Sequence, residues 1–125
     1  MPDTTTHALV IEDEPDVLDL LARHISRLGM RVSRASSGGA GLTKALADVP
    51  DVVIVDINLP DIDGREVIRR LRADERTSDC SIVVCSVLDR DDLIALGADA
   101  ILAKPFQRAS VAEVFADLSI SPEGK

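Results

Sequence analysis

The stretch that most constrains the fold runs from residue 52 to residue 64. It begins with Val-Val-Ile-Val, which leads directly into Asp56. A short apolar run without alternation is typical of a strand buried on both faces of a parallel sheet. Turn-forming Asn, Pro, Asp and Gly follow, so we expect the strand to end near Asp56. Because ligands bind at the carboxyl ends of strands in open α/β sheets, Asp56 is the first candidate functional residue.

Similar apolar runs recur along the chain and alternate with segments of helical spacing. We expect strands at residues 8–11, 30–35, 52–56, 81–86 and 100–103, and helices at residues 15–28, 36–48, 65–72, 89–96 and 107–119. The helix at 36–48 has the weakest signal, because three glycines lower its helix propensity and predict a loose first turn. The helix at 89–96 is only about two turns long. This alternation predicts βαβ units and a parallel sheet covered by helices on both faces.

Size and composition restrict the class of protein. A chain of 125 residues is one domain, and we expect flexible ends at residues 1–7 and 120–125 around a domain of residues 8–119. Only 2% of the residues are aromatic, so the core must be built from Val, Ile, Leu and Ala. A net charge of −8 argues against a nucleic-acid surface. No run approaches the roughly 20 apolar residues of a membrane span, and no signal peptide is apparent, so we expect a cytoplasmic protein without membrane contact.

Polar side chains stand at the carboxyl ends of four of the expected strands: Glu12 and Asp13, Asp56, Ser86 and Lys104. In a parallel sheet these ends meet at one edge, within a few strand spacings of each other. Three carboxylates placed so closely repel one another, and a hard cation such as Mg2+ would relieve this repulsion. A metal and an ammonium group around one carboxylate suit phosphoryl transfer onto Asp56, with the Ser86 hydroxyl as a hydrogen-bond donor.

Several segments, taken in order, resemble one known family. They are residues 10–15 (Val-Ile-Glu-Asp-Glu-Pro), residues 56–64, Ser86, residues 97–99 (Gly-Ala-Asp) and residues 104–106 (Lys-Pro-Phe). With them, the chain resembles the receiver domain of two-component response regulators over residues 8–119. The resemblance implies a flavodoxin-like (βα)5 sandwich with a five-stranded parallel sheet in the order 2-1-3-4-5.

The resemblance also implies a mechanism and partners. Asp56 is expected to accept a phosphoryl group from the phosphohistidine of a sensor histidine kinase or a phosphotransfer protein. Mg2+, or Mn2+ as the alternative ion, would be bound by the side chains of Asp13 and Asp56 and by the backbone carbonyl of Asn58. Glu12 would hold a metal-bound water. Such a domain is a switch that assists its own phosphorylation and slow dephosphorylation, not an enzyme. A downstream protein and a homodimer through the fourth helix, fifth strand and fifth helix are further expected partners.

Ser86 and Lys104 would contact the phosphoryl group, and the Lys104–Pro105 peptide bond is expected to be cis. The chain departs from the family pattern on the face that usually transmits the signal. Ile101 replaces the usual switch aromatic, Val87 replaces a small residue, and the segment 86–97 is about one helical turn shorter. We therefore predict that Asp56 can be phosphorylated while the readout differs from the usual coupling of hydroxyl and aromatic.

Other interpretations of the same residues remain open. The acids at the strand ends could cap the following helices, and Asp61 and Asp63 are expected to be turn residues. A receiver-like module that binds partners independently of phosphorylation is the main alternative function. A small-molecule phosphatase would need a second Asp two residues after the nucleophile, where Asn58 stands. His7 and His24 are expected at the surface or its boundary.

Overall fold

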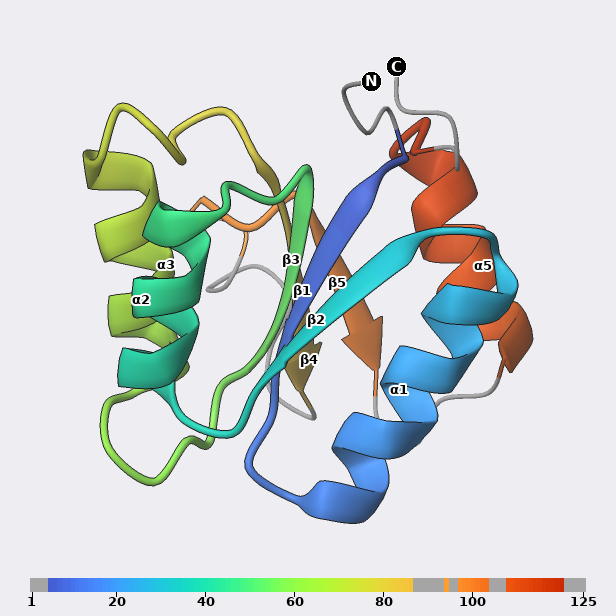
Figure 1. The fold of residues 1–125 in the computed structure, drawn as a ribbon, viewed down its shortest axis with the longest axis horizontal. Helices are drawn as coiled ribbons and strands as arrows, with labels where there is room; N and C mark the ends of the chain where they lie inside the picture. Colours follow the sequence, from blue (N-terminus) through green and yellow to red (C-terminus); the bar gives the residue numbers. More distant parts are fainter. Residues whose placement is uncertain (1–4, 87–93, 95–96, 104–107, 121–125) are drawn as a thin grey trace.

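The computed structural model describes residues 5–86, 94, 97–103 and 108–120. A five-stranded sheet lies between two layers of helices (Figure 1). In chain order the elements are β1 (His7–Ile11), α1 (Pro15–Arg27), β2 (Arg31–Ala35), α2 (Gly38–Ala47), β3 (Val52–Asp56), α3 (Gly64–Ala73), β4 (Ser81–Ser86), β5 (Ala100–Ala103) and α5 (Arg108–Asp117).

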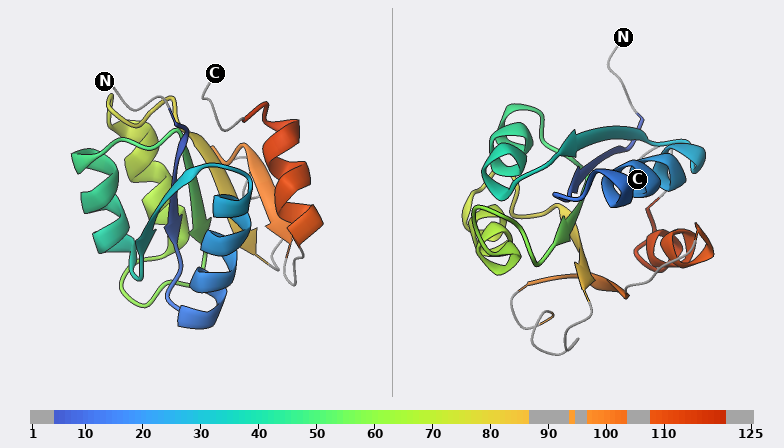
Figure 2. Two further views of the ribbon diagram at one scale, coloured as in Figure 1. Left: turned by 45° about the vertical axis from the view of Figure 1, so that its right-hand side comes forward. Right: turned by 90° about the horizontal axis from the view of Figure 1, so that it is seen from below.

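All neighbouring strands are parallel, and their order is β2-β1-β3-β4-β5. This confirms the α/β class and the strand order that the resemblance implies. Helices α2 and α3 cover one face of the sheet, and α1 and α5 cover the other, as both views in Figure 2 show. The carboxyl ends of the strands lie at the bottom of the view in Figure 1.

Each face of the sheet has its own hydrophobic core. Alternate residues of one strand point into opposite cores: Val53 and Val55 pack under α2 and α3, while Val52 and Ile54 pack under α1 and α5. All five residues of β3 are buried, as the unalternated sequence predicts. In the observed register Val55 pairs with Ile11 of β1, and this pairing sets the place where Asp56 emerges.

The glycines that weaken the helix prediction at 36–48 have a packing role. A Cβ atom at Gly41 would lie 2.4 Å from Ile11 Cδ1, and one at Gly38 would lie 2.4 Å from Ile62 Cγ1. Only glycine allows α2 to approach β1 and the loop after β3 this closely. The Ser37 side chain accepts a hydrogen bond from the Ala40 N–H and caps the helix. The expected helix is therefore confirmed, starting at Gly38.

The expectation that His7 and His24 lie at the surface or its boundary is wrong. His7 begins β1 one residue earlier than predicted and is 4% exposed, because its backbone pairs with Arg31 of β2. Its ring Nε2 lies 2.7 Å from Ser33 Oγ. His24 is buried because it lies on the same face of α1 as Leu21, three residues away.

Some expectations fall outside the described residues. The helix predicted at 89–96 lies outside the described residues, except for residue 94. The same holds for residues 1–4 and 121–125 and for residue 107, the first of the helix predicted at 107–119. The described part of that last helix packs inward through Val111, Val114, Phe115 and Leu118, as predicted. Within the described ranges, no helix has the length and apolar character needed to cross a membrane.

Candidate functional site

Three carboxylates converge where β1 and β3 end. Ile11 pairs with Val55, so the residues that follow β1 lie beside Asp56 at the end of β3. Carboxylate oxygens of Glu12, Asp13 and Asp56 all lie within 4.8 Å of one another. Glu12 is 1% exposed and Asp56 6% exposed, whereas Asp13 is half-buried. The structure thus brings Asp56 beside Glu12 and Asp13, which lie more than forty positions earlier in the sequence.

Backbone groups orient two of these carboxylates. The Glu14 N–H donates to Glu12 Oε2 at 3.2 Å, and the Asn58 N–H donates to Asp56 Oδ1 at 3.3 Å. Gly64 lies directly against the main chain of Asp56, since a Cβ atom at this glycine would be 2.4 Å from the Asp56 carbonyl oxygen. The start of α3 therefore holds the end of β3 in place.

The donor set of this pocket fits a hard divalent cation. Carboxylate oxygens are the ligands that Mg2+ prefers, and Mg2+ usually takes few protein ligands and keeps several waters. Asp13 is partly open to solvent, which leaves room for water or a phosphate oxygen beside the buried acids. In the part of the chain that the structure describes, this is the one group of three His, Cys, Asp or Glu side chains close enough to hold a metal ion. Asn58, two residues after Asp56, is exposed, and its N–H donates to the Asp56 carboxylate.

The remaining predicted site residues are placed only in part. Ser86 ends β4 one residue beyond Cys85, the pairing partner of Asp56, so its backbone lies at the same edge of the sheet. Ile101 of β5 pairs with Val84 of β4 and packs, partly buried, against the core under α2 and α3. The Ser86 side chain, Val87, Lys104 and Pro105 lie outside the described residues. Their roles stay predictions, as does the cis peptide bond.

Asp61 has a contact that the sequence does not predict. Its carboxylate accepts hydrogen bonds from the first two N–H groups of α2, Gly38 N at 2.8 Å and Gly39 N at 2.7 Å. These bonds, led by the one from Gly39, lower the pKa of Asp61 below its ordinary value. The partner groups lie more than twenty residues away, so no local pattern around Asp61 could have revealed them.

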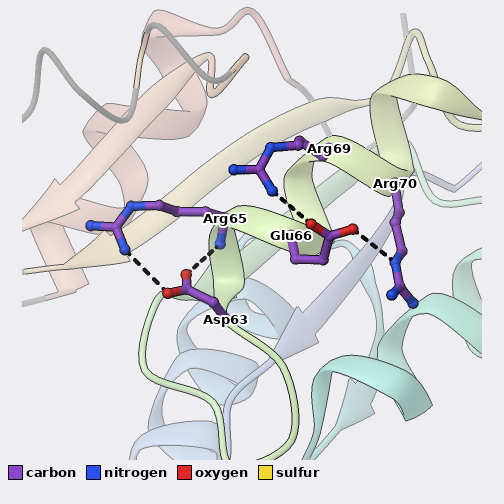
Figure 3. A network of polar contacts seen from close by, with 5 residues as sticks. All are labelled: Asp63, Arg65, Glu66, Arg69 and Arg70. Carbon is purple, nitrogen blue, oxygen red and sulfur yellow. Dashed lines mark hydrogen bonds and ion pairs between the residues drawn. The ribbon is translucent and has the colours of Figure 1, made fainter.

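Asp63 and the outer face of α3 form a separate polar network (Figure 3). Asp63 accepts hydrogen bonds from the backbone and the side chain of Arg65 and caps the helix. Glu66 accepts from Arg69 at 2.6 Å and from Arg70 at 3.1 Å, and these bonds, that of Arg70 first, lower the pKa of Glu66. Asp63 is thus a helix cap, and the exposed charges of this face partner one another.

Comparison with known proteins agrees with this geometry. The sequence pattern of the response regulator receiver domain family matches residues 8–116. The DNA-binding dual master transcriptional regulator RpaA of Synechocystis is 36% identical over 102 residues, which are 78% of this chain and 42% of RpaA. This chain spans about half the length of the curated relatives it matches.

Solved structures agree with the fold. Chemotaxis response regulator CheY4 of Vibrio cholerae superposes with a TM-score of 0.85 at 23% identity, covering 91% of this chain and 98% of CheY4. The receiver domain of a sensor histidine kinase from Pseudomonas aeruginosa, with a magnesium ion coordinated in its active site cleft, superposes with a TM-score of 0.82 at 26% identity. That match covers 90% of this chain and 96% of the other. The family pattern over residues 8–116, together with the sheet order and the acidic pocket, shows that this chain belongs to the response regulator receiver domain family.

Proposed function

We propose that this receiver domain is a phosphorylation switch in which Asp56 is the phosphoacceptor. The phosphoryl group would come from a phosphohistidine of a sensor histidine kinase or a phosphotransfer protein, in the cytoplasm. The observation that carries the proposal is the convergence of Glu12, Asp13 and Asp56 at the carboxyl edge of the sheet, with oxygens within 4.8 Å of one another. Family membership supports it, because a receiver domain is a signalling phosphoacceptor and not a classical enzyme.

The acidic pocket would hold Mg2+, with Mn2+ as the alternative ion. Asp13 and Asp56 would bind through their side chains and Asn58 through its carbonyl, while Glu12 would hold a metal-bound water. A bound divalent ion supplies positive charge that stabilises the oxygens of a transferring phosphoryl group. The Pseudomonas receiver with its coordinated magnesium supports this assignment.

In the proposed reaction, one carboxylate oxygen of Asp56 attacks the phosphorus in line with the leaving imidazole. The new O–P bond forms as the P–N bond breaks, and the imidazole nitrogen regains its electron pair and takes a proton. The Asn58 N–H orients the Asp56 carboxylate for this attack. Ser86 would donate a hydrogen bond to the phosphoryl oxygens and Lys104 would pair with them. Slow attack of water on the aspartyl phosphate would release phosphate and restore the carboxylate.

The output face is proposed to be atypical. Ile101 packs against the core under α2 and α3, and an aliphatic side chain has no hydroxyl with which to report the state of the site. This packing also favours the second candidate function, a phosphorylation-independent interaction module. A downstream protein, or a second copy at the face of the fourth helix, β5 and α5, would receive the signal.

Intact-mass spectrometry distinguishes the two functions. The protein is incubated with acetyl phosphate, with and without Mg2+, beside the variant Asp56→Ala and the control Asp19→Asn, whose carboxylate lies on the exposed side of α1. The switch predicts one added phosphoryl group that requires Mg2+, is absent in Asp56→Ala and persists in Asp19→Asn. A wild-type protein that gains no phosphoryl group and binds no Mg2+ contradicts the switch and favours the interaction module.

A further inference from the structure

The loop of residues 57–63 joins the candidate phosphoacceptor to helix α2. It leaves Asp56 at the end of β3 and reaches α3, passing beneath the start of α2 at the lower left of Figure 1. Asp61 bridges this loop to α2 through its two hydrogen bonds with the Gly38 and Gly39 N–H groups. A carboxylate placed there also interacts favourably with the positive end of the helix dipole.

Close packing reinforces this bridge. The side chain of Ile62 fills the space where Gly38 would carry a Cβ atom, with Cγ1 at 2.4 Å and Cδ1 at 2.9 Å from that position. The Cβ position of Gly39 is 3.1 Å from Asp61 Oδ2. Two successive loop residues thus contact the start of α2. Asp61 accepts hydrogen bonds from Gly38 and Gly39, and Ile62 packs against Gly38.

The other end of the loop is attached to the site. The Asn58 N–H donates to the Asp56 carboxylate, and the Ile57 carbonyl accepts from Leu59 N at 3.2 Å and from Gly64 N at 2.9 Å. The loop is therefore fixed at Asp56, at the start of α3 and at the start of α2. A shift of residues 57 and 58 has to be taken up at one of these three attachments, because close-packed contacts do not deform continuously.

We propose that Asp61 is a positioning residue for the phosphoacceptor site, because its bridge to Gly38 and Gly39 holds the loop of residues 57–63 in place and couples the state of Asp56 to helix α2. The inference rests on the proposed function. The bridge acts on the site by holding residues 57 and 58 in the arrangement that orients the Asp56 carboxylate. Loss of the bridge therefore slows phosphoryl acceptance, and phosphorylation of Asp56 changes the environment of the Gly38 and Gly39 amides.

The competing interpretation is that Asp61 only stabilises the helix end. Ser37 offers the matched control, since its hydroxyl caps the same end of α2 by accepting from a helix residue, Ala40 N, at 3.2 Å. Ser37→Ala weakens the helix end and leaves the bridge in place. Asp61→Asn keeps one carbonyl oxygen and so retains one of the two acceptor bonds.

The test compares the rate of phosphorylation by acetyl phosphate in Mg2+, followed by intact mass, with the urea stability of each variant. We expect Asp61→Ala to be roughly tenfold slower, the lower end of what is lost when groups that support metal ligands are removed. Asp61→Asn should fall between Asp61→Ala and wild type, and Ser37→Ala should react at the wild-type rate. Two-dimensional NMR of the wild type should show the Gly38 and Gly39 amide signals shifting on phosphorylation.

Each other outcome overturns a distinct claim. A wild-type protein that takes no phosphoryl group overturns the proposed function, and the inference with it. Phosphorylation of wild type and Asp61→Ala at equal rates, or equal slowing by Ser37→Ala, overturns the inference alone. If Asp61→Ala does not fold, the NMR measurement decides: unchanged Gly38 and Gly39 signals in phosphorylated wild type refute the coupling.

Discussion

At the scale of single residues, Gly64 helps to position Asp56, because only a residue without a side chain can lie this close to the end of β3. Its Cα approaches the end of β3 so closely that a methyl group there would lie 2.4 Å from the Asp56 carbonyl oxygen and 2.7 Å from Ile57 Cα. These are backbone atoms of a buried strand end, and they cannot rotate away. The position of the Asp56 carboxylate therefore depends on this glycine.

Gly64→Ala is expected to lower the free energy of unfolding by about 2 kcal/mol, within the range for overpacked sites, and to slow phosphorylation of Asp56. Urea unfolding and the acetyl phosphate assay measure the two effects. Gly39→Ala is the control for stability, because its methyl group would lie 3.1 Å from a side-chain atom, Asp61 Oδ2, and not against backbone atoms. Equal stability of the Gly64→Ala and Gly39→Ala proteins would contradict this account of the contact.

His7 makes stability depend on pH. Burial, followed by the positive charge of Arg31, lowers the pKa of His7 below its ordinary value of 6.5. The unfolded chain therefore binds a proton more readily than the folded protein does. A neutral His7 contributes fully to the stability of the fold at pH values above its ordinary pKa. This contribution is lost as the pH falls from there through the pKa of His7 in the folded protein.

We expect the urea midpoint of the wild type to fall more between about pH 7.5 and about pH 5.5 than that of His7→Gln, which has no titrating ring. The difference between the two pH slopes is the quantity to measure, since the substitution also changes stability at every pH. Parallel slopes for the two proteins would show that His7 does not titrate differently on folding.

At the scale of elements, Arg72 of α3 connects three segments around β4 and β5. Its guanidinium donates to the carbonyl oxygens of Ser78, Cys80 and Gly97 and to Asp99 Oδ2. Asp99 Oδ2 also accepts from the Ile82 N–H at 2.7 Å. This one side chain donates to backbone carbonyls that precede β4 and β5 in the chain, so it helps to set the position of β5 beside β4.

Arg72→Lys is expected to lower the free energy of unfolding by about 2 kcal/mol, because a lysine cannot reproduce the planar guanidinium and leaves partly buried carbonyl oxygens without a donor. Arg70→Lys is the matched control on the same helix, where the exposed pair with Glu66 (Figure 3) predicts no measurable change. Chemical unfolding of both variants provides the comparison, and similar losses in the two would contradict the connecting role of Arg72.

The elements themselves follow from local patterns, but two of their contacts do not. Unalternated runs such as residues 52–55 predict strands buried on both faces, and Pro15 marks a helix start. Burial of His7 depends on pairing with β2, and the bridge of Asp61 depends on α2. Both partners are more than twenty residues away, and no period of 2 or 3.6 residues carries that information.

At the scale of the whole molecule, the order of the strands creates the site. Placing β1 next to β3 brings Glu12 and Asp13 beside Asp56, and placing β4 on the other side of β3 brings the Ser86 backbone to the same edge. The sequence predicts this convergence because polar residues stand directly after each apolar run. The strand order itself comes from the resemblance to a family, since propensity and periodicity do not determine it.

The central claim is that the Asp56 carboxylate accepts the phosphoryl group. The most direct test is to phosphorylate the protein with acetyl phosphate, reduce the acyl phosphate with borohydride and sequence the peptides by mass spectrometry. The account predicts homoserine at position 56, because reduction converts an aspartyl phosphate to that residue, and intact Asp13 and Glu12. Homoserine elsewhere with an unmodified Asp56, or a phosphoryl group that survives reduction on another side chain, would contradict it.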